Sequence, residues 1–135
     1  MASNQVLCFI DDDKIYQYTV SRTIKMQALA HQVLLFNDGE EAMDYLTGHS
    51  DLSGQLPDVI FLDINMPIMN GWQFLDEYAS LKPRLPKPIT IYMVTSSVDP
   101  EDRIHASRIA EISDYIVKPV KPEILKSLID KIQKI

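Results

Sequence analysis

The sequence predicts an α/β fold in which a parallel sheet of five strands is covered by helices on both faces. Two observations favour this fold class. Five short segments are continuously apolar, as is typical of strands buried on both faces, and they span 5–10, 32–36, 59–62, 89–94 and 115–117. Each is followed by a segment with helical features, and this alternation is typical of βαβ units. Because we find no linker, internal repeat or low-complexity tract, we expect one domain over residues 1–135.

The first two strands are each followed by a predicted helix. Residues 5–10 form the first apolar segment, and residues 14–30 then contain no Gly or Pro, which favours a helix. Residues 32–36 form the second predicted strand, and turn-forming residues follow it. Apolar positions on one side predict a helix over 40–46. The polar segment 47–56, which holds two glycines, is expected to be a loop.

The third strand, 59–62, lies in the middle of the chain and ends at a carboxylate, Asp63. Turn residues follow it, and apolar residues with helical spacing then predict a helix that ends near Leu81. Residues 82–88 hold three prolines, so we expect no regular structure there. The fourth strand is predicted over 89–94.

The last two helices are predicted from their first residues. Asp99 is a suitable N-cap with Pro100 at the first helical position, and acidic residues follow in the first turn. After the short fifth strand, 115–117, Pro122 opens the final helix. An apolar stripe marks that helix and consists of Ile124, Leu125, Leu128, Ile129 and Ile132.

Composition narrows the function classes. The net charge is −6 and no basic run is present, which argues against a nucleic-acid surface. No apolar stretch approaches the length of a membrane span, and the apolar residues near the N-terminus are too few for a signal peptide. A single cysteine, Cys8, cannot form an internal disulfide, which fits a reducing compartment. We therefore expect a cytoplasmic protein that does not insert into membranes.

Polar residues gather at the carboxyl ends of the predicted strands. Asp11 and Asp12 follow the first strand, Asp63 the third, Thr95 the fourth and Lys118 the fifth. In a parallel sheet these ends lie on one edge, and in the strand order 2-1-3-4-5 strands one and three flank the crevice where ligands bind. Three carboxylates are then expected to converge, with a hydroxyl and an ammonium nearby.

Such a cluster requires protons, cations or a metal ion to offset its negative charge. Two carboxylates 4 Å apart repel by about 4 kcal/mol at an effective dielectric constant near 20. An all-oxygen set of ligands suits a hard divalent cation that keeps several waters, which favours Mg²⁺. A cation beside Asp63, with Thr95 and Lys118 in reach, is suited to phosphoryl transfer onto Asp63, giving an aspartyl phosphate. The sequence contains no glycine-rich phosphate loop, so a nucleotide is not the obvious phosphoryl donor.

The motifs at these strand ends resemble those of one family over essentially the whole chain. Asp11-Asp12, Asp63-Ile-Asn-Met-Pro, Val94-Thr95-Ser96 and Tyr115-Ile-Val-Lys118-Pro119 resemble the receiver domain of two-component response regulators, in the right order on the right strands. The resemblance implies a flavodoxin-like doubly wound fold. It also implies a phosphorelay in which a sensor histidine kinase or a phosphotransfer protein phosphorylates Asp63. Because the chain is filled by one receiver with no output domain, we expect its output to act through a separate downstream protein.

The resemblance further implies which residues bind the metal ion. The side chains of Asp12 and Asp63 and the backbone carbonyl of Asn65 would bind Mg²⁺, with Asp11 acting through water. No other cofactor is implied.

The remaining site residues are implied to respond to the phosphoryl group. Thr95 and Lys118 would bond to it, Tyr115 occupies the family's switch position, and the Lys118–Pro119 peptide bond would be cis. Two charge-assisted hydrogen bonds contribute roughly 3–6 kcal/mol. Moving a two-state population from 1:99 to 99:1 needs about 5.5 kcal/mol, so these two contacts can drive most of a switch provided they form only after phosphorylation.

Two other functions remain open from the sequence. A Mg²⁺-dependent phosphohydrolase of the haloacid-dehalogenase type also forms an aspartyl phosphate, but it needs a second aspartate two residues after the nucleophile. Here that residue is Asn65. A module that binds partners independently of phosphorylation is the second alternative, and the complete set of Asp, Thr and Lys residues argues against it.

Overall fold

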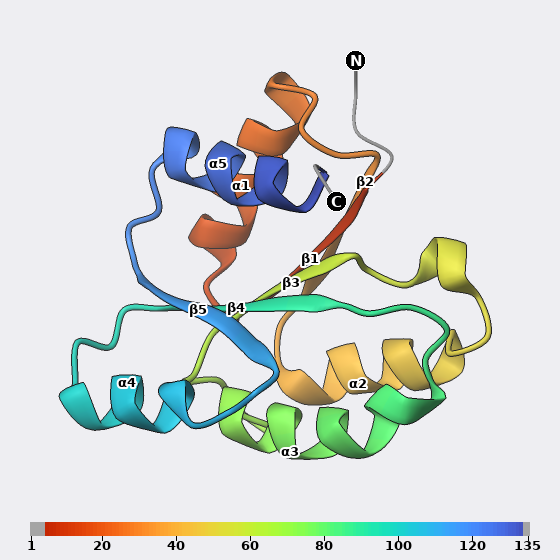
Figure 1. Cartoon of the computed structure of the whole chain (residues 1–135). Coiled ribbons are helices and arrows are strands. Elements are labelled where there is room, and N and C mark those ends of the chain that lie inside the picture. The colour runs from red at the N-terminus through yellow and green to blue at the C-terminus, as the bar shows by residue number, and fades with distance from the viewer. Residues whose placement is uncertain (1–4, 134–135) are drawn as a thin grey trace.

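The computed structural model describes residues 5–133, and within them five strands form one parallel sheet in the order β2-β1-β3-β4-β5 (Figure 1). The predicted fold class is therefore confirmed. The register pairs Ile10 of β1 with Leu62 of β3, so these two neighbouring strands end side by side. The strands are β1 (Val6–Ile10), β2 (Gln32–Phe36), β3 (Val59–Leu62), β4 (Thr90–Thr95) and β5 (Ile112–Val117).

Helices cover both faces of the sheet. Figure 1 shows α1 and α5 on one face and α2, α3 and α4 on the other. Each face has its own apolar core, because successive side chains of a strand point to opposite faces: Leu7 packs toward α1 and α5, and Cys8 toward α2 and α3. The described helices are α1 (Lys14–Met26), α2 (Gly39–Gly48), α3 (Gly71–Leu81), α4 (Pro100–Ser107) and α5 (Pro122–Gln133).

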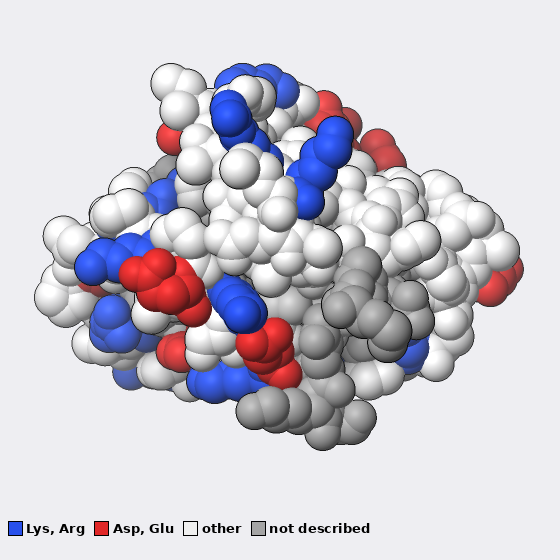
Figure 2. All heavy atoms as spheres, turned by 90° about the horizontal axis from the view of Figure 1, so that it is seen from above, with Lys and Arg blue, Asp and Glu red and all other residues white. Residues whose placement is uncertain are grey.

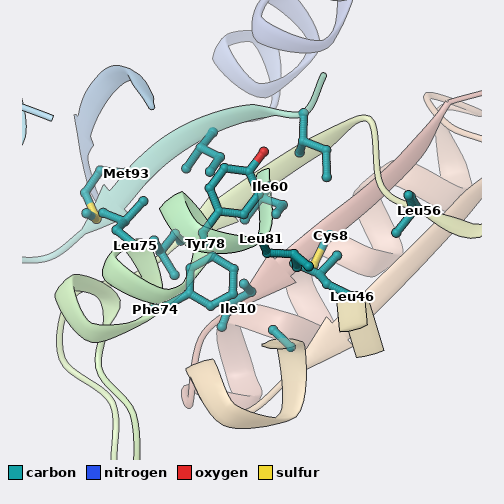
Figure 3. Packing of buried hydrophobic residues seen from close by; sticks show 14 of the residues in the cluster. Cys8, Ile10, Leu46, Leu56, Ile60, Phe74, Leu75, Tyr78, Leu81 and Met93 are labelled. Atoms are coloured by element: carbon teal, nitrogen blue, oxygen red, sulfur yellow. The ribbon is translucent and has the colours of Figure 1, made fainter. Parts of the chain in front are cut away.

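Helix α3 provides much of the apolar core on the face of the sheet that α2 and α3 cover. Its Phe74 and Tyr78 are essentially inaccessible to solvent, and their rings stack with centroids 6.2 Å apart. Figure 3 shows both rings beside Ile10 of β1 and Ile60 of β3. Burying each aromatic side chain contributes about 1.5–3 kcal/mol, so α3 is held firmly against the strand that ends at Asp63.

Helix α1 is shorter than the sequence predicts, because it ends at Met26 rather than near Ala30. Ala28 has a left-handed backbone conformation, with φ of 50°. The amide of Ala28 donates to the carbonyl of Lys25 at 3.3 Å, and the amide of Leu29 donates to that of Ile24 at 3.0 Å. These are the two bonds of a Schellman motif. The usual glycine is absent, so the sequence did not reveal this helix end.

An Ala28→Gly substitution should stabilise the protein by about 1 kcal/mol, because Gly adopts the left-handed conformation without the Cβ clash that alanine suffers. Chemical denaturation measures the change. Ala79→Gly is the matched control: Ala79 is exposed within α3, where Gly should instead destabilise by about 1 kcal/mol. Equal destabilisation by both substitutions would contradict this description of the α1 terminus.

The structure also corrects other predicted segments and boundaries. Helix α2 continues to Gly48, and a 3₁₀ turn, η1 (Ser53–Gln55), lies in the predicted loop. A second 3₁₀ turn, η2 (Lys82–Arg84), lies in the proline-rich segment, because proline is tolerated in the first turn of a helix. Strand β4 ends with Thr95 rather than before it. Strand β5 begins at Ile112 rather than at Tyr115. The sequence pattern missed its first half, because polar residues that face solvent at the sheet edge interrupt the apolar run there.

Other predicted features are confirmed. Asp99 caps α4 by accepting a hydrogen bond from the amide of Glu101 at 3.0 Å, and Pro122 begins α5. The side chain of Ile132 lies outside the described part. None of the helices within residues 5–133 has the length and apolar character that a membrane crossing requires. On the described part of the face in Figure 2, basic and acidic side chains are interspersed, without a large patch of one sign.

Candidate functional site

Three carboxylates lie together at the carboxyl ends of β1 and β3. Among the described residues, one oxygen each from Asp11, Asp12 and Asp63 lies within 4.8 Å of the others. Asp11 is 2% and Asp63 7% exposed, whereas Asp12 is open to solvent. The cluster therefore combines two buried acids with one at the surface, so one side of it is open to solvent.

The position of Asp63 is fixed by its backbone. Its amide donates to the carbonyl of Ile10 at 3.0 Å, and its Oδ1 accepts from the amide of Ile64 at 2.8 Å. Gly71, the first residue of α3, donates to the carbonyl of Ile64 at 2.8 Å. A Cβ on Gly71 would lie 2.3 Å from the carbonyl oxygen of Asp63, so only glycine allows this approach.

Lys118 lies between the two buried acids. Its Nζ is 2.5 Å from Oδ2 of Asp11 and 3.6 Å from Oδ2 of Asp63. Its amide donates to the carbonyl of Thr95 at 2.8 Å, and the Lys118–Pro119 peptide bond is cis, as the resemblance implies.

The electrostatics of this cluster are unbalanced. Burial raises the pKa of Asp11, the hydrogen bond from Lys118 opposes this shift, and the charge of Asp63 adds to it. One ammonium therefore does not neutralise three carboxylates, and the cluster can hold further positive charge. Its oxygen-only ligands suit a hard divalent cation.

Thr95 and Tyr115 lie on the neighbouring strands. Thr95 is fully buried at the end of β4, and its Oγ1 accepts from the amide of Ser97 at 3.3 Å. The hydroxyl of Tyr115 on β5 donates to the carbonyl of Ser97 at 3.1 Å, while Arg103 of α4 lies 4.8 Å from the centre of its ring. Asn65 is exposed in the loop after β3. The side chains of Thr95 and Tyr115 are thus both hydrogen-bonded to the backbone of Ser97.

Gln17 is a residue of the site that the sequence reasoning missed. It is buried, and its side-chain amide donates to the carbonyls of Asp11 at 2.6 Å and Phe36 at 3.0 Å. It thereby ties the acidic turn to the end of β2. The helical spacing of the sequence could have indicated that Gln17 is buried, because Gln17 shares a helical face with Val20 and Ile24, both of which are buried.

The family model for the response regulator receiver domain matches residues 7–130. The chain belongs to this family. A chemotaxis protein CheY homolog from Campylobacter jejuni is 32% identical over 127 residues, which cover 93% of this chain and 90% of that protein. The recognition made from the strand-end motifs is therefore confirmed.

Solved structures of response regulators share the fold of this receiver domain. A two component response regulator from Cytophaga hutchinsonii is 26% identical with a TM-score of 0.83, and the match covers 96% of this chain and 97% of that one. The Mn²⁺-bound form of response regulator Rcp1 is 23% identical with a TM-score of 0.73, and the match covers 96% of this chain and 92% of that one. At this identity the likeness shows only that the two proteins share a fold.

Proposed function

We propose that this receiver domain accepts a phosphoryl group on Asp63 in a Mg²⁺-dependent reaction within a cytoplasmic phosphorelay. The donor is a phosphohistidine of a sensor histidine kinase or a phosphotransfer protein. A carboxylate oxygen of Asp63 forms the new bond to phosphorus as the bond to the donor's imidazole nitrogen breaks. The observation that supports this function is the convergence of Asp11, Asp12 and Asp63 around the ammonium of Lys118.

The residues present fit a magnesium ion. In this proposal the side chains of Asp12 and Asp63 and the carbonyl of Asn65 hold it, with Asp11 contributing through water. When bound, the cation neutralises charge on the acids and on the phosphoryl oxygens. The excess of negative charge in the cluster supports this assignment. So does the Mn²⁺-bound form of response regulator Rcp1, because that protein shares the fold and holds a divalent ion.

Lys118 and Thr95 then bond to the phosphoryl oxygens. Lys118 already lies 3.6 Å from an oxygen of Asp63, so a short movement of its ammonium is enough. A movement of Thr95 reaches Tyr115 through Ser97, because both side chains are hydrogen-bonded to the backbone of Ser97. We infer that this link makes Tyr115 the switch residue, whose new position alters a surface that a separate downstream protein binds.

Incubation with acetyl phosphate and Mg²⁺ should add one phosphoryl group to the intact protein, as measured by mass spectrometry. Chelation of the metal with EDTA should prevent the addition, because the charge on the acid cluster is then uncompensated. Beryllofluoride, which mimics the phosphoryl group, should shift the ring resonances of Tyr115 in NMR spectra. Equal phosphorylation in EDTA would overturn the metal requirement, and an unchanged Tyr115 ring would overturn the switch.

The proposal differs measurably from the two alternatives. Steady turnover of phosphate esters, lost on replacing Asp63, would favour a phosphohydrolase, although Asn65 lacks the acid–base group that such an enzyme needs. Partner binding that is unaffected by phosphorylation would favour a module that is independent of phosphate.

A further inference from the structure

The ammonium of Lys118 lies against an aromatic ring as well as against the two acids. Its Nζ is 4.3 Å from the centre of the Tyr16 ring, within the range of a cation–π interaction. The lysine side chain is only 16% exposed, and it is long and flexible, so a fixed place for its charge requires contacts on several sides. Tyr16, on the first turn of α1, supplies one of these contacts.

Tyr16 is itself held by the acidic turn. Oδ1 of Asp11 accepts from the amide of Asp13 at 2.9 Å. The side chain of Asp13 caps α1 by accepting from the amides of Ile15 at 3.0 Å and Tyr16 at 3.1 Å. The Tyr16 ring meets the ring of Phe9 edge-on, with centroids 6.4 Å apart. Asp13 therefore fixes the start of the helix that carries this ring.

These contacts form a closed circuit. It runs from Asp11 to Asp13, from Asp13 to Tyr16, from the Tyr16 ring to Lys118, and from Lys118 back to Asp11. Residues more than 100 positions apart in the sequence are joined in this way. The position of the Lys118 ammonium is therefore linked through these contacts to the acidic turn and to the first turn of α1.

The hydroxyl group of Tyr16 makes no hydrogen bond within residues 5–133 that would favour tyrosine at this position. It is buried and has no hydrogen-bond partner within the described part of the chain. Burial raises the pKa of Tyr16, and the charges of Asp11 and Asp63 raise it further. A buried hydroxyl without a partner is unfavourable, so the useful part of this side chain is its ring.

We propose that Tyr16 is a positioning residue: the face of its ring holds the ammonium of Lys118 in place for phosphoryl transfer to Asp63. This inference rests on the proposed function and adds a residue to it. Without the ring, Lys118 samples more conformations and spends less time beside Asp63, so its contribution to the transition state falls.

The test compares substitutions of Tyr16 with a substitution of Tyr18, which lies on the same helix. Tyr16→Leu removes the ring and Tyr16→Phe removes only the hydroxyl. Tyr18→Leu is the control, because Tyr18 is 63% exposed and bonds only Arg22 among the described contacts. Tyr16→Met provides a second ring-free variant if Tyr16→Leu does not fold. Two quantities are measured: the rate of phosphorylation by acetyl phosphate with Mg²⁺, and the NMR shift of the Lys118 ε-methylene protons without metal.

The ring-free variants should be phosphorylated about three- to tenfold more slowly than the parent, and their Lys118 ε-methylene protons should lose the ring-current shift. Tyr16→Phe should restore both the rate and the shift, and Tyr18→Leu should change neither. Parent-like rates and shifts in a folded ring-free variant would overturn the inference. A parent protein that takes up no phosphoryl group would instead overturn the proposed function, and the metal-free shift would still test the contact.

Discussion

An Asp63→Asn variant should fold like the parent protein and take up no phosphoryl group. The amide side chain has the same shape, and its oxygen can still accept the hydrogen bond from the amide of Ile64, now 2.8 Å long. The variant loses the nucleophilic carboxylate, which nothing else in the site replaces in the same position. Intact mass after incubation with acetyl phosphate and Mg²⁺ measures this result.

The matched control lies at the opposite end of the same strand. Asp58 precedes β3, and its side chain accepts from the amide of Val6 at 2.8 Å and pairs with Lys87 at 2.9 Å. Asp58→Asn removes an equal charge from β3 far from the acid cluster, so phosphorylation should proceed at the parent rate. If Asp63→Asn were phosphorylated as fast as Asp58→Asn, the acceptor would have to be a different residue.

Gly71→Ala should destabilise the protein by about 3 kcal/mol and also slow phosphorylation. The new Cβ would lie 2.3 Å from the carbonyl oxygen of Asp63 and 3.1 Å from the Cα of Ile64, so the backbone of Asp63 and Ile64 must move. Because α3 packs firmly on β3, it cannot shift freely to make room. We expect a melting temperature lower by about 10 °C.

Gly48→Ala is the control for this substitution. Gly48 ends α2, and a Cβ there meets no atom within 4 Å. Because alanine favours helix more than glycine, this variant should be as stable as the parent or gain up to about 1 kcal/mol. Equal stability of Gly71→Ala and Gly48→Ala would show that the close approach of α3 to Asp63 does not constrain the site.

The central part of the fold could be predicted from the sequence, because buried parallel strands are continuously apolar. The buried strand β3 has the bounds that this pattern predicts, and so does β2, an edge strand that is partly exposed but apolar after Gln32. The edge strand β5 does not follow the pattern, since Ser113 and Asp114 face solvent, and half of it was missed. The end of α1 was missed because Ala28 adopts a conformation in which glycine is the usual residue.

For the candidate site, the strand-end rule brought together residues that are distant in the sequence. It predicted that the three carboxylates and Lys118 would meet, because parallel strands end at one edge. It could not predict contacts made by side chains from helices. The helical pattern of α1 could indicate that Gln17 is buried, but not which atoms it contacts. The contact of the Tyr16 ring with Lys118 and that of the Gln17 amide with the carbonyl of Asp11 depend on how α1 packs on β1.

Identifying the phosphorylated residue tests the account most directly. The protein is phosphorylated with acetyl phosphate in the presence of Mg²⁺, the acyl phosphate is reduced with borohydride, and the peptides are sequenced by mass spectrometry. We expect the modification on Asp63 alone, and none when EDTA replaces Mg²⁺. Modification of a different residue, or of Asp63 equally in EDTA, would contradict the claim that a cation held by the acid cluster makes Asp63 the phosphoryl acceptor.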